Sequence, residues 1–199
     1  MRALRPFFSL IGLLLAAGAP LAQAQTSPGW GLAGLMRSLA EVHAASASFT
    51  ETKTMAVLKT PLVTSGTLRY VAPDYLSKTV LSPTRQDFVL HNGAVTLTVD
   101  GKVQRFNLAQ APALAGLVDG VRATLAGDLP SLERFYTVSL SGDAETWQLL
   151  LHPRDAGLRH LVSWLSIRGS GRKLTEISTG GVGGDLTRMS VHETIDHAP

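Results

Sequence analysis

The residue types that most often carry catalysis or hold metals are scattered along this sequence. Its 199 residues include no cysteine, which excludes thiolate ligands and a cysteine nucleophile, and none of its six histidines belongs to an HExxH pair. Because a zinc site needs three or four converging ligands, we expect no metal. No serine stands in a Gly-x-Ser-x-Gly elbow, and no pair of acidic residues stands out for acid–base work. The sequence therefore predicts a protein that is not an enzyme and has no cofactor, although a triad assembled from distant positions stays open as an alternative.

Two glycine-rich segments have the composition of turns rather than of phosphate-binding loops. GGVGGD at residues 180–185 is followed by neither a lysine nor a helical pattern, and GSGRK at residues 169–173 resembles a solvated turn. The formal net charge is only +3, and two of the basic residues, Arg2 and Arg5, lie in an N-terminal segment that we expect to be removed. No basic stripe with interleaved aromatic residues occurs, so we expect no nucleic acid partner.

The strongest pattern is apolar, and it favours a hydrophobic cavity under a loosely held lid. Large apolar residues recur on predicted strands and on a predicted helix, where together they could surround a ligand. For each residue taken singly, an ordinary core position is the alternative. The candidate ligand-binding residues are Phe49, Leu68, Tyr70, Phe88, Leu97, Phe106, Leu114, Leu117, Trp147 and Trp164.

Two segments have the apolar period of amphipathic helices. The first follows Ser27-Pro28 and continues to about residue 45, and the second covers residues 109–127 and ends at Gly127. A short helical turn is expected at residues 131–135. Each long helix contains internal glycines, which lower its intrinsic stability, so we expect both to depend on docking to a sheet and to form a loose lid.

The rest of the chain has the period of two that is typical of strands. Residues 66–108 form a meander whose Asn92-Gly93 and Asp100-Gly101 pairs suit tight hairpin turns. After the second helix the strand pattern returns and continues to about residue 193. We therefore predict one α+β domain built on a long, curved antiparallel sheet that curls toward a barrel or half-barrel.

The N-terminus has the three parts of a signal peptide. Arg2 and Arg5 precede an apolar run that is too short to span a bilayer, and Ala22-Gln23-Ala24 is a small-x-small cleavage site. We therefore expect residues 1–24 to be a signal peptide cleaved after Ala24, and residues 25–199 to be one domain exported to the periplasm. A membrane anchor is the alternative.

Four short motifs occur in order along most of the mature chain. They are LAEV at 39–42 followed by ASFTET at 47–52, GTL at 66–68 with a proline at 73, LHNGAVTL at 90–97, and WQLLLHP at 147–153. In order and spacing they resemble the LolA family of periplasmic outer-membrane lipoprotein carriers, of which this chain would be a divergent member. The family's Arg before the proline of the second motif is replaced here by Ala72.

The resemblance implies an unclosed antiparallel β-barrel with two or three helices covering the concave face. It also implies a non-catalytic monomer that binds acyl chains of a lipoprotein or another envelope lipid. An inner-membrane transporter would donate this cargo and an outer-membrane protein would accept it. Because Ala72 departs from the lipoprotein carriers, other envelope lipids such as glycolipids or pigment lipids are equally open as cargo. The alternatives are a protein-binding or sensor module without a lipid ligand and, last, a periplasmic hydrolase.

Overall fold

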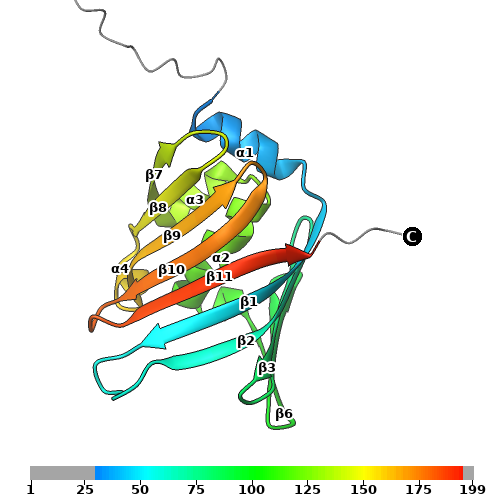
Figure 1. Cartoon of the computed structure of the whole chain (residues 1–199), viewed down its shortest axis with the longest axis vertical. Helices are drawn as coiled ribbons and strands as arrows, with labels where there is room; N and C mark the ends of the chain where they lie inside the picture. Colours follow the sequence, from blue (N-terminus) through cyan, green and yellow to red (C-terminus); the bar gives the residue numbers. More distant parts are fainter. Residues whose placement is uncertain (1–29, 195–199) are drawn as a thin grey trace, which may run out of the picture.

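The computed structural model describes residues 30–194, which form one antiparallel sheet and a set of helices packed on one of its faces (Figure 1). The predicted signal peptide lies outside these residues. The strands are β1 (Ala44–Thr54), β2 (Leu62–Val71), β3 (Tyr75–Ser82), β4 (Gln86–His91), β5 (Ala94–Val99), β6 (Lys102–Asn107), β7 (Tyr136–Gly142), β8 (Trp147–Pro153), β9 (Val162–Ser170), β10 (Lys173–Gly181) and β11 (Leu186–Thr194). The helices are α1 (Leu32–Ala40), the short 3₁₀ helix η1 (Leu108–Gln110), α2 (Pro112–Leu125), α3 (Leu129–Phe135) and α4 (Ala156–Arg159).

The eleven strands lie in the order β6-β5-β4-β3-β2-β1-β11-β10-β9-β8-β7. The first and last strands of the chain, β1 and β11, pair with each other at the centre of the sheet. Strands β6 and β7 are the two edges, and the sheet bends without closing between them (Figure 1). The prediction of an α+β fold with a curved, unclosed antiparallel sheet is confirmed.

The predicted hairpin turns of the meander are present. Asn92 and Gly93 have φ angles of 50° and 70°, and Asp100 and Gly101 have φ angles of 50° and 74°. Positive φ at both central residues is the geometry that Asn-Gly and Asp-Gly pairs tolerate best, and its twist matches that of the flanking strands. These turns fix the register of β4, β5 and β6, and hence the side chains that point to the concave face.

Four α-helices occur within residues 30–194, one more than the two or three predicted. The additional helix, α4, has four residues and is capped by the Asp155 carboxylate, which accepts a hydrogen bond from the Leu158 amide at 2.8 Å. A helix this short has no measurable apolar period, which is why the sequence pattern did not reveal it. None of the helices in residues 30–194 is long and apolar enough to cross a bilayer.

The main hydrophobic core lies over one half of the sheet. It joins α1, α2, α3 and α4 to the concave side of β7, β8 and β9, with Leu132, Leu149 and Ile167 fully buried. Two smaller clusters lie over the other half, one around Phe49 and one around Leu90. An apolar space between α2 and the middle of the sheet lies among these three clusters.

Candidate ligand-binding pocket

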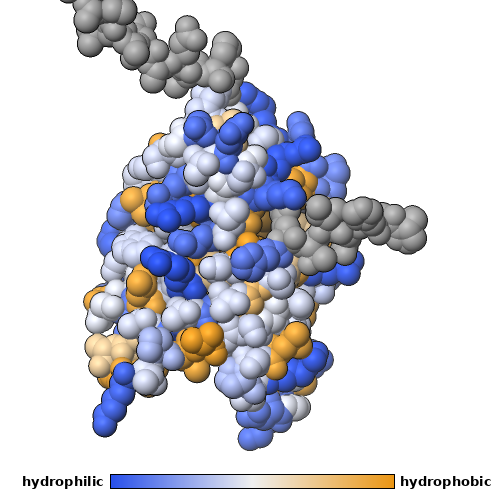
Figure 2. All heavy atoms as spheres, viewed as in Figure 1, coloured by the Kyte–Doolittle hydropathy of each residue, from blue (hydrophilic) through white to orange (hydrophobic). Residues whose placement is uncertain are grey.

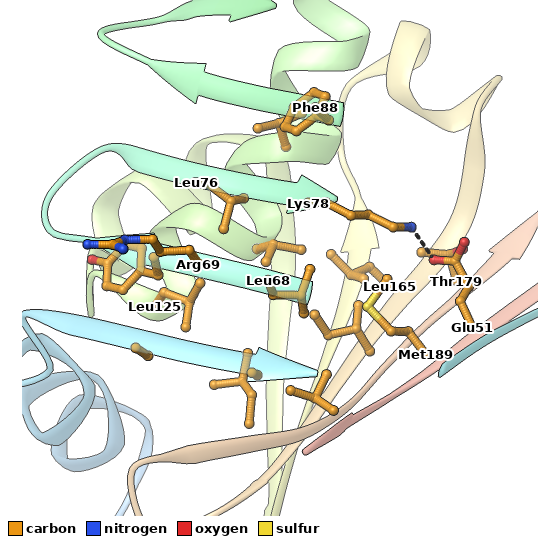
Figure 3. Close-up of a pocket in the computed structure, with 18 of the residues that line it drawn as sticks. Glu51, Leu68, Arg69, Leu76, Lys78, Phe88, Leu125, Leu165, Thr179 and Met189 are labelled. Carbon is orange, nitrogen blue, oxygen red and sulfur yellow. Dashed lines mark hydrogen bonds and ion pairs between the residues drawn. The ribbon is translucent and has the colours of Figure 1, made fainter. Parts of the chain in front are cut away.

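A cavity of about 340 Å³ lies between α2 and the concave face of the sheet (Figure 3). This volume falls at the lower end of the range usual for small-molecule sites. Strands β1 to β4 and β9 to β11 form its wall together with α2, and most of the lining side chains are aliphatic. Those that Figure 3 labels include Leu68, Leu76, Phe88, Leu125, Leu165 and Met189.

Small side chains on β1 create part of the space. Residues 45, 47, 49 and 51 point to the concave face, because alternate residues of a strand share a face. At the first two of these positions the chain has Ala45 and Ala47, which line the pocket opposite Tyr70 and Leu68 of β2. Two alanines at the centre of the concave face leave a hollow that larger residues would fill.

Helix α2 turns its small residues to the core and its large apolar residues to the pocket. Gly116, Gly120, Ala123 and Thr124 are the buried residues of the helix. By contrast, the large side chains that line the pocket are only partly buried: Leu117, Val118, Val121 and Leu125. Burial of apolar surface lowers the free energy by roughly 25 cal/mol per Å². An apolar ligand that covers this face of α2 is therefore stabilised by the contact.

The two buried glycines of α2 serve close packing. A Cβ atom at Gly116 would lie 2.9 Å from Leu158 Cδ2, and one at Gly120 would lie 2.7 Å from Leu165 Cδ2. The Tyr136 hydroxyl donates a buried hydrogen bond of 3.0 Å to the Gly116 carbonyl. These contacts hold α2 against β7, β9 and α4, so the glycines that the sequence suggested as softening a lid also provide the surface by which the helix is anchored.

An ion pair stands in the wall of this mostly apolar pocket. Lys78 Nζ lies 2.7 Å from Glu51 Oε2, with the two side chains 27% and 18% exposed, and 4.9 Å from the centroid of the Phe49 ring. Figure 3 shows this pair close to Thr179 and Met189. It gives one end of the pocket a polar character, with a cation and an anion that a ligand head group can contact.

Tyr70 brings a buried hydroxyl to the pocket wall. The residue is 2% exposed, and its hydroxyl has no hydrogen-bond partner among the described residues. Burial raises the pKa of this phenol; Arg122 opposes the shift and Asp74 adds to it. An unsatisfied buried hydroxyl is costly and therefore uncommon, so this group is available to donate to an oxygen of a bound molecule.

A second hollow, of about 530 Å³, is lined by charged as well as apolar residues. It lies between the turns at one end of the meander and helices α2 and α3. Arg122 bonds Asp119 at 2.7 Å across its wall, and the Arg122 guanidinium also reaches the Pro73 carbonyl at 3.5 Å. Because Asp74, Asp119, Arg122 and Arg134 stand in its wall, this hollow suits an acyl chain less well than the apolar one.

Of the ten predicted ligand-binding residues, four line the apolar pocket: Leu68, Tyr70, Phe88 and Leu117. Phe106 and Leu114 belong to the neighbouring cluster around Leu90, which shares Phe88 with the pocket. Leu97 lies opposite Phe88 on β5, on the same face of the sheet but outside the pocket wall.

The other three predicted residues lie elsewhere. Phe49 is buried beside the pocket against Ala47 and Val191, and Trp147 is buried in the main core, where its indole N–H donates to the Gly171 carbonyl at 2.8 Å. Trp164 is on the opposite face of the sheet from Leu165, since adjacent residues of a strand point to opposite sides. It packs on Gly180 of β10, where any side chain would collide with the indole.

Sequence reasoning missed most of the pocket wall. The missed residues include the alanines of β1, the ion pair of Glu51 and Lys78, further apolar residues of α2 and β3, and aliphatic residues of β9, β10 and β11 such as Leu165, Ile177 and Met189. The sequence did contain a signal for part of this wall. Ala45, Ala47, Phe49 and Glu51 share one face of β1, and two alanines beside larger residues indicate a hollow on the inner face of the sheet.

Within residues 30–194, no group of three or more His, Asp or Glu side chains is placed to hold a metal ion. The side chains in the apolar pocket that carry hydroxyls are Ser46, Tyr70, Thr179 and Thr187, and no histidine stands among the described pocket residues.

A family model described as "Outer membrane lipoprotein carrier protein LolA-like" matches residues 27–198. No curated protein matches the sequence. Among solved structures, a LolA superfamily protein from Nitrosomonas europaea is similar at 8% identity and a TM-score of 0.43, covering 83% of this chain and 93% of that one. The Mycobacterium tuberculosis lipoprotein LppX is similar at 12% identity and a TM-score of 0.41, covering 83% and 94%. The Pseudomonas aeruginosa MucA/MucB complex is similar at 14% identity and a TM-score of 0.43, covering 84% of this chain and 58% of that one. At these TM-scores the structural likenesses carry no argument about function.

Proposed function

Because this chain belongs to the LolA-like family of outer membrane lipoprotein carrier proteins, we propose that it is a non-catalytic periplasmic carrier that binds the acyl chain of a lipoprotein or another envelope lipid. In this proposal residues 1–24 are the signal peptide and residues 25–199 the carrier domain, which acts as a monomer. It receives cargo from an inner-membrane transporter and passes it to an acceptor at the outer membrane.

The observation that carries this proposal is the unfilled apolar pocket under α2. Leu117, Val118, Val121 and Leu125 of the helix face the aliphatic residues of the sheet across a space of about 340 Å³. A protein that needed α2 only for stability would fill this space, since interiors pack to crystal-like density. An alkyl chain supplies the missing contacts without requiring a hydrogen bond from the wall.

The energetics favour capture of an alkyl chain. Burying one methylene contributes about 0.8 kcal/mol, so a chain of several methylenes offsets the cost of association. Polar groups at the pocket, among them the Lys78–Glu51 pair and the Tyr70 hydroxyl, suit the ester, amide or head-group oxygens of a lipid.

The experiment has two measurements on the purified mature protein. Mass spectrometry of an organic extract is expected to find a co-purified lipid, and a fluorescent fatty-acid probe is expected to bind saturably with one site. Replacing Leu117 and Val121 together by Trp fills the pocket from the helix side and should weaken probe binding at least tenfold. Ser139→Trp adds an indole on the exposed outer side of β7 and should bind the probe as the unmodified protein does.

Far-ultraviolet circular dichroism and thermal unfolding must show that the filled variant is folded. If the unmodified protein carries no lipid and shows no saturable probe binding, the carrier proposal fails, and a protein-binding or sensor module on the same scaffold becomes the better explanation. Equal probe binding by the filled variant and the Ser139→Trp control would mean that the ligand occupies another site.

A further inference from the structure

The most exposed apolar side chains of the described residues gather at one end of the sheet. Four of them lie in the connection between β1 and β2 or directly after it: Val57, Leu58, Leu62 and Val63. Val57, at the tip, is 82% exposed. An isolated exposed valine needs no explanation, but a cluster on a protruding hairpin marks an interaction surface.

The antiparallel order of the sheet brings four more to the same end. The connections β1–β2, β3–β4, β5–β6, β8–β9 and β10–β11 all lie there, since each strand runs opposite to its neighbours. We call these connections and their flanking strand residues the rim. Leu81, Val103, Leu161 and Val182 belong to the last four of these connections or their flanks, and they are 46–60% exposed. All eight exposed large apolar side chains recorded for residues 30–194 therefore lie on the rim.

The rim runs along the left and lower edge of the molecule as drawn in Figure 1, away from α1. Figure 2 shows apolar side chains along this edge that are separated by polar ones rather than joined in one groove. Separate apolar tips suit the interface of a bilayer, into which each tip inserts independently. A folded protein partner would instead require a continuous complementary surface.

The charge of the longest tip favours an anionic surface. Residues 53–63, KTMAVLKTPLV, contain Lys53 and Lys59 and no acidic residue. Neither lysine forms an ion pair within residues 30–194. Other connections of the rim carry both signs of charge, such as Asp100 with Lys102 and Asp155 with Arg159, whereas the β1–β2 hairpin carries positive charge alone.

The apolar pocket approaches the rim at its polar end. Glu51 precedes the last residue of β1 by three positions, and Thr179 pairs with Thr187 next to the β10–β11 turn. All three residues line the pocket. A protein resting on a bilayer by its rim would thus hold this end of the pocket close to the membrane surface.

We propose that the rim, led by the β1–β2 hairpin, docks on the surface of a bilayer that contains anionic phospholipids. The apolar tips insert at the level of the head groups, and the hairpin lysines contact lipid phosphates. This surface is separate from the pocket and does not require that the pocket carry a lipid.

The test is co-sedimentation of the purified mature protein with vesicles. We expect binding to vesicles of phosphatidylcholine and phosphatidylglycerol in equal parts, and much weaker binding to phosphatidylcholine alone or at high salt. Val57→Asp combined with Leu58→Asp should lower the partition coefficient at least tenfold. The matched control, Ala94→Asp with Ser141→Asp, adds the same charge at exposed positions of the opposite end and should retain most of the binding.

A second set of variants separates charge from insertion. Lys53→Gln and Lys59→Gln should each lower the partition coefficient about fivefold on anionic vesicles. The Val57→Trp variant should show a blue-shifted tryptophan emission and quenching by brominated lipids when vesicles are added. The hairpin variants should bind the fatty-acid probe normally, which distinguishes this proposal from that of the pocket.

Three results would overturn the proposal: no binding of the unmodified protein to anionic vesicles, equal loss in the hairpin variant and its matched control, or a tryptophan emission of the Val57→Trp variant that vesicles do not change. Self-association that depends on Val57, without vesicle binding, would identify the rim as a contact between copies of this chain instead.

Discussion

Replacing Gly120 by alanine tests whether the glycines of α2 serve to soften the helix or to pack it. In a solvent-exposed helix, Gly→Ala would stabilise the protein by about 1 kcal/mol. Here the new Cβ would stand 2.7 Å from Leu165 Cδ2 and 3.0 Å from the Tyr136 hydroxyl oxygen, against an optimum of roughly 3.5–4.0 Å for carbon contacts. Overpacking of this kind costs about 1–3 kcal/mol, so we expect a net loss of about 1 kcal/mol.

The same substitution should also affect the pocket. Leu165 is fully buried and contacts Gly120 on one side, while the other side lines the apolar cavity. When a Cβ at residue 120 pushes on Leu165, this side chain can move only into the open space of the cavity. Gly120→Ala is therefore expected to narrow the pocket and to weaken binding of the fatty-acid probe severalfold.

The assay is urea unfolding and thermal unfolding together with probe titration. For a chain of 199 residues, 1 kcal/mol corresponds to a fall in Tm of about 2–4 °C. Gly183→Ala is the matched control, since a Cβ there meets no atom within 4 Å. An increase in stability of about 1 kcal/mol with unchanged probe affinity would refute the packing argument and support a purely softening role.

Three further predictions concern polar groups. Tyr136→Phe removes the hydrogen bond to the Gly116 carbonyl and should cost about 1 kcal/mol at neutral pH. Burial, with a contribution from Asp119, raises the pKa of the Tyr136 phenol above its usual 10. The phenol therefore ionises first in the unfolded state, and the free energy of unfolding should fall above about pH 10. Urea unfolding should show a smaller loss of stability over that pH range in the Tyr136→Phe variant. Tyr70→Phe deletes a hydroxyl without a partner among the described residues, so thermal unfolding should show unchanged or slightly higher stability, and a clear loss would reveal a missed hydrogen bond. Glu51→Gln and Lys78→Met in a double-mutant cycle should show a coupling energy of about 1 kcal/mol in urea unfolding. A coupling energy near zero at low salt would show that the attraction between the two side chains does not contribute to stability.

The sequence by itself determined the class of fold. Alternating apolar residues and the Asn92-Gly93 and Asp100-Gly101 pairs predicted the meander, because the side-chain period of a strand and the φ angles of a tight turn are local properties. The apolar period of residues 109–127 likewise predicted α2, within three residues at each end. The motif order also identified the family, which the match over residues 27–198 confirms.

Only the tertiary structure decided which apolar residues surround a hollow and which fill a core. Trp147 and Leu117 are both large and apolar, yet Trp147 is fully buried in the main core while Leu117 is partly buried at its margin and lines the pocket. Trp164 and Leu165 are neighbours in a strand that is apolar on both faces. The alternation of side chains along the strand could therefore not show which of the two points inward. The pocket owes part of its volume to the small side chains of Ala45 and Ala47, while Gly116 and Gly120 let α2 pack closely on β7, β9 and α4 beside it. A cavity forms where side chains from distant segments do not contact one another. The periodicity of apolar residues within one helix or strand is local, so it contains no information about such missing contacts.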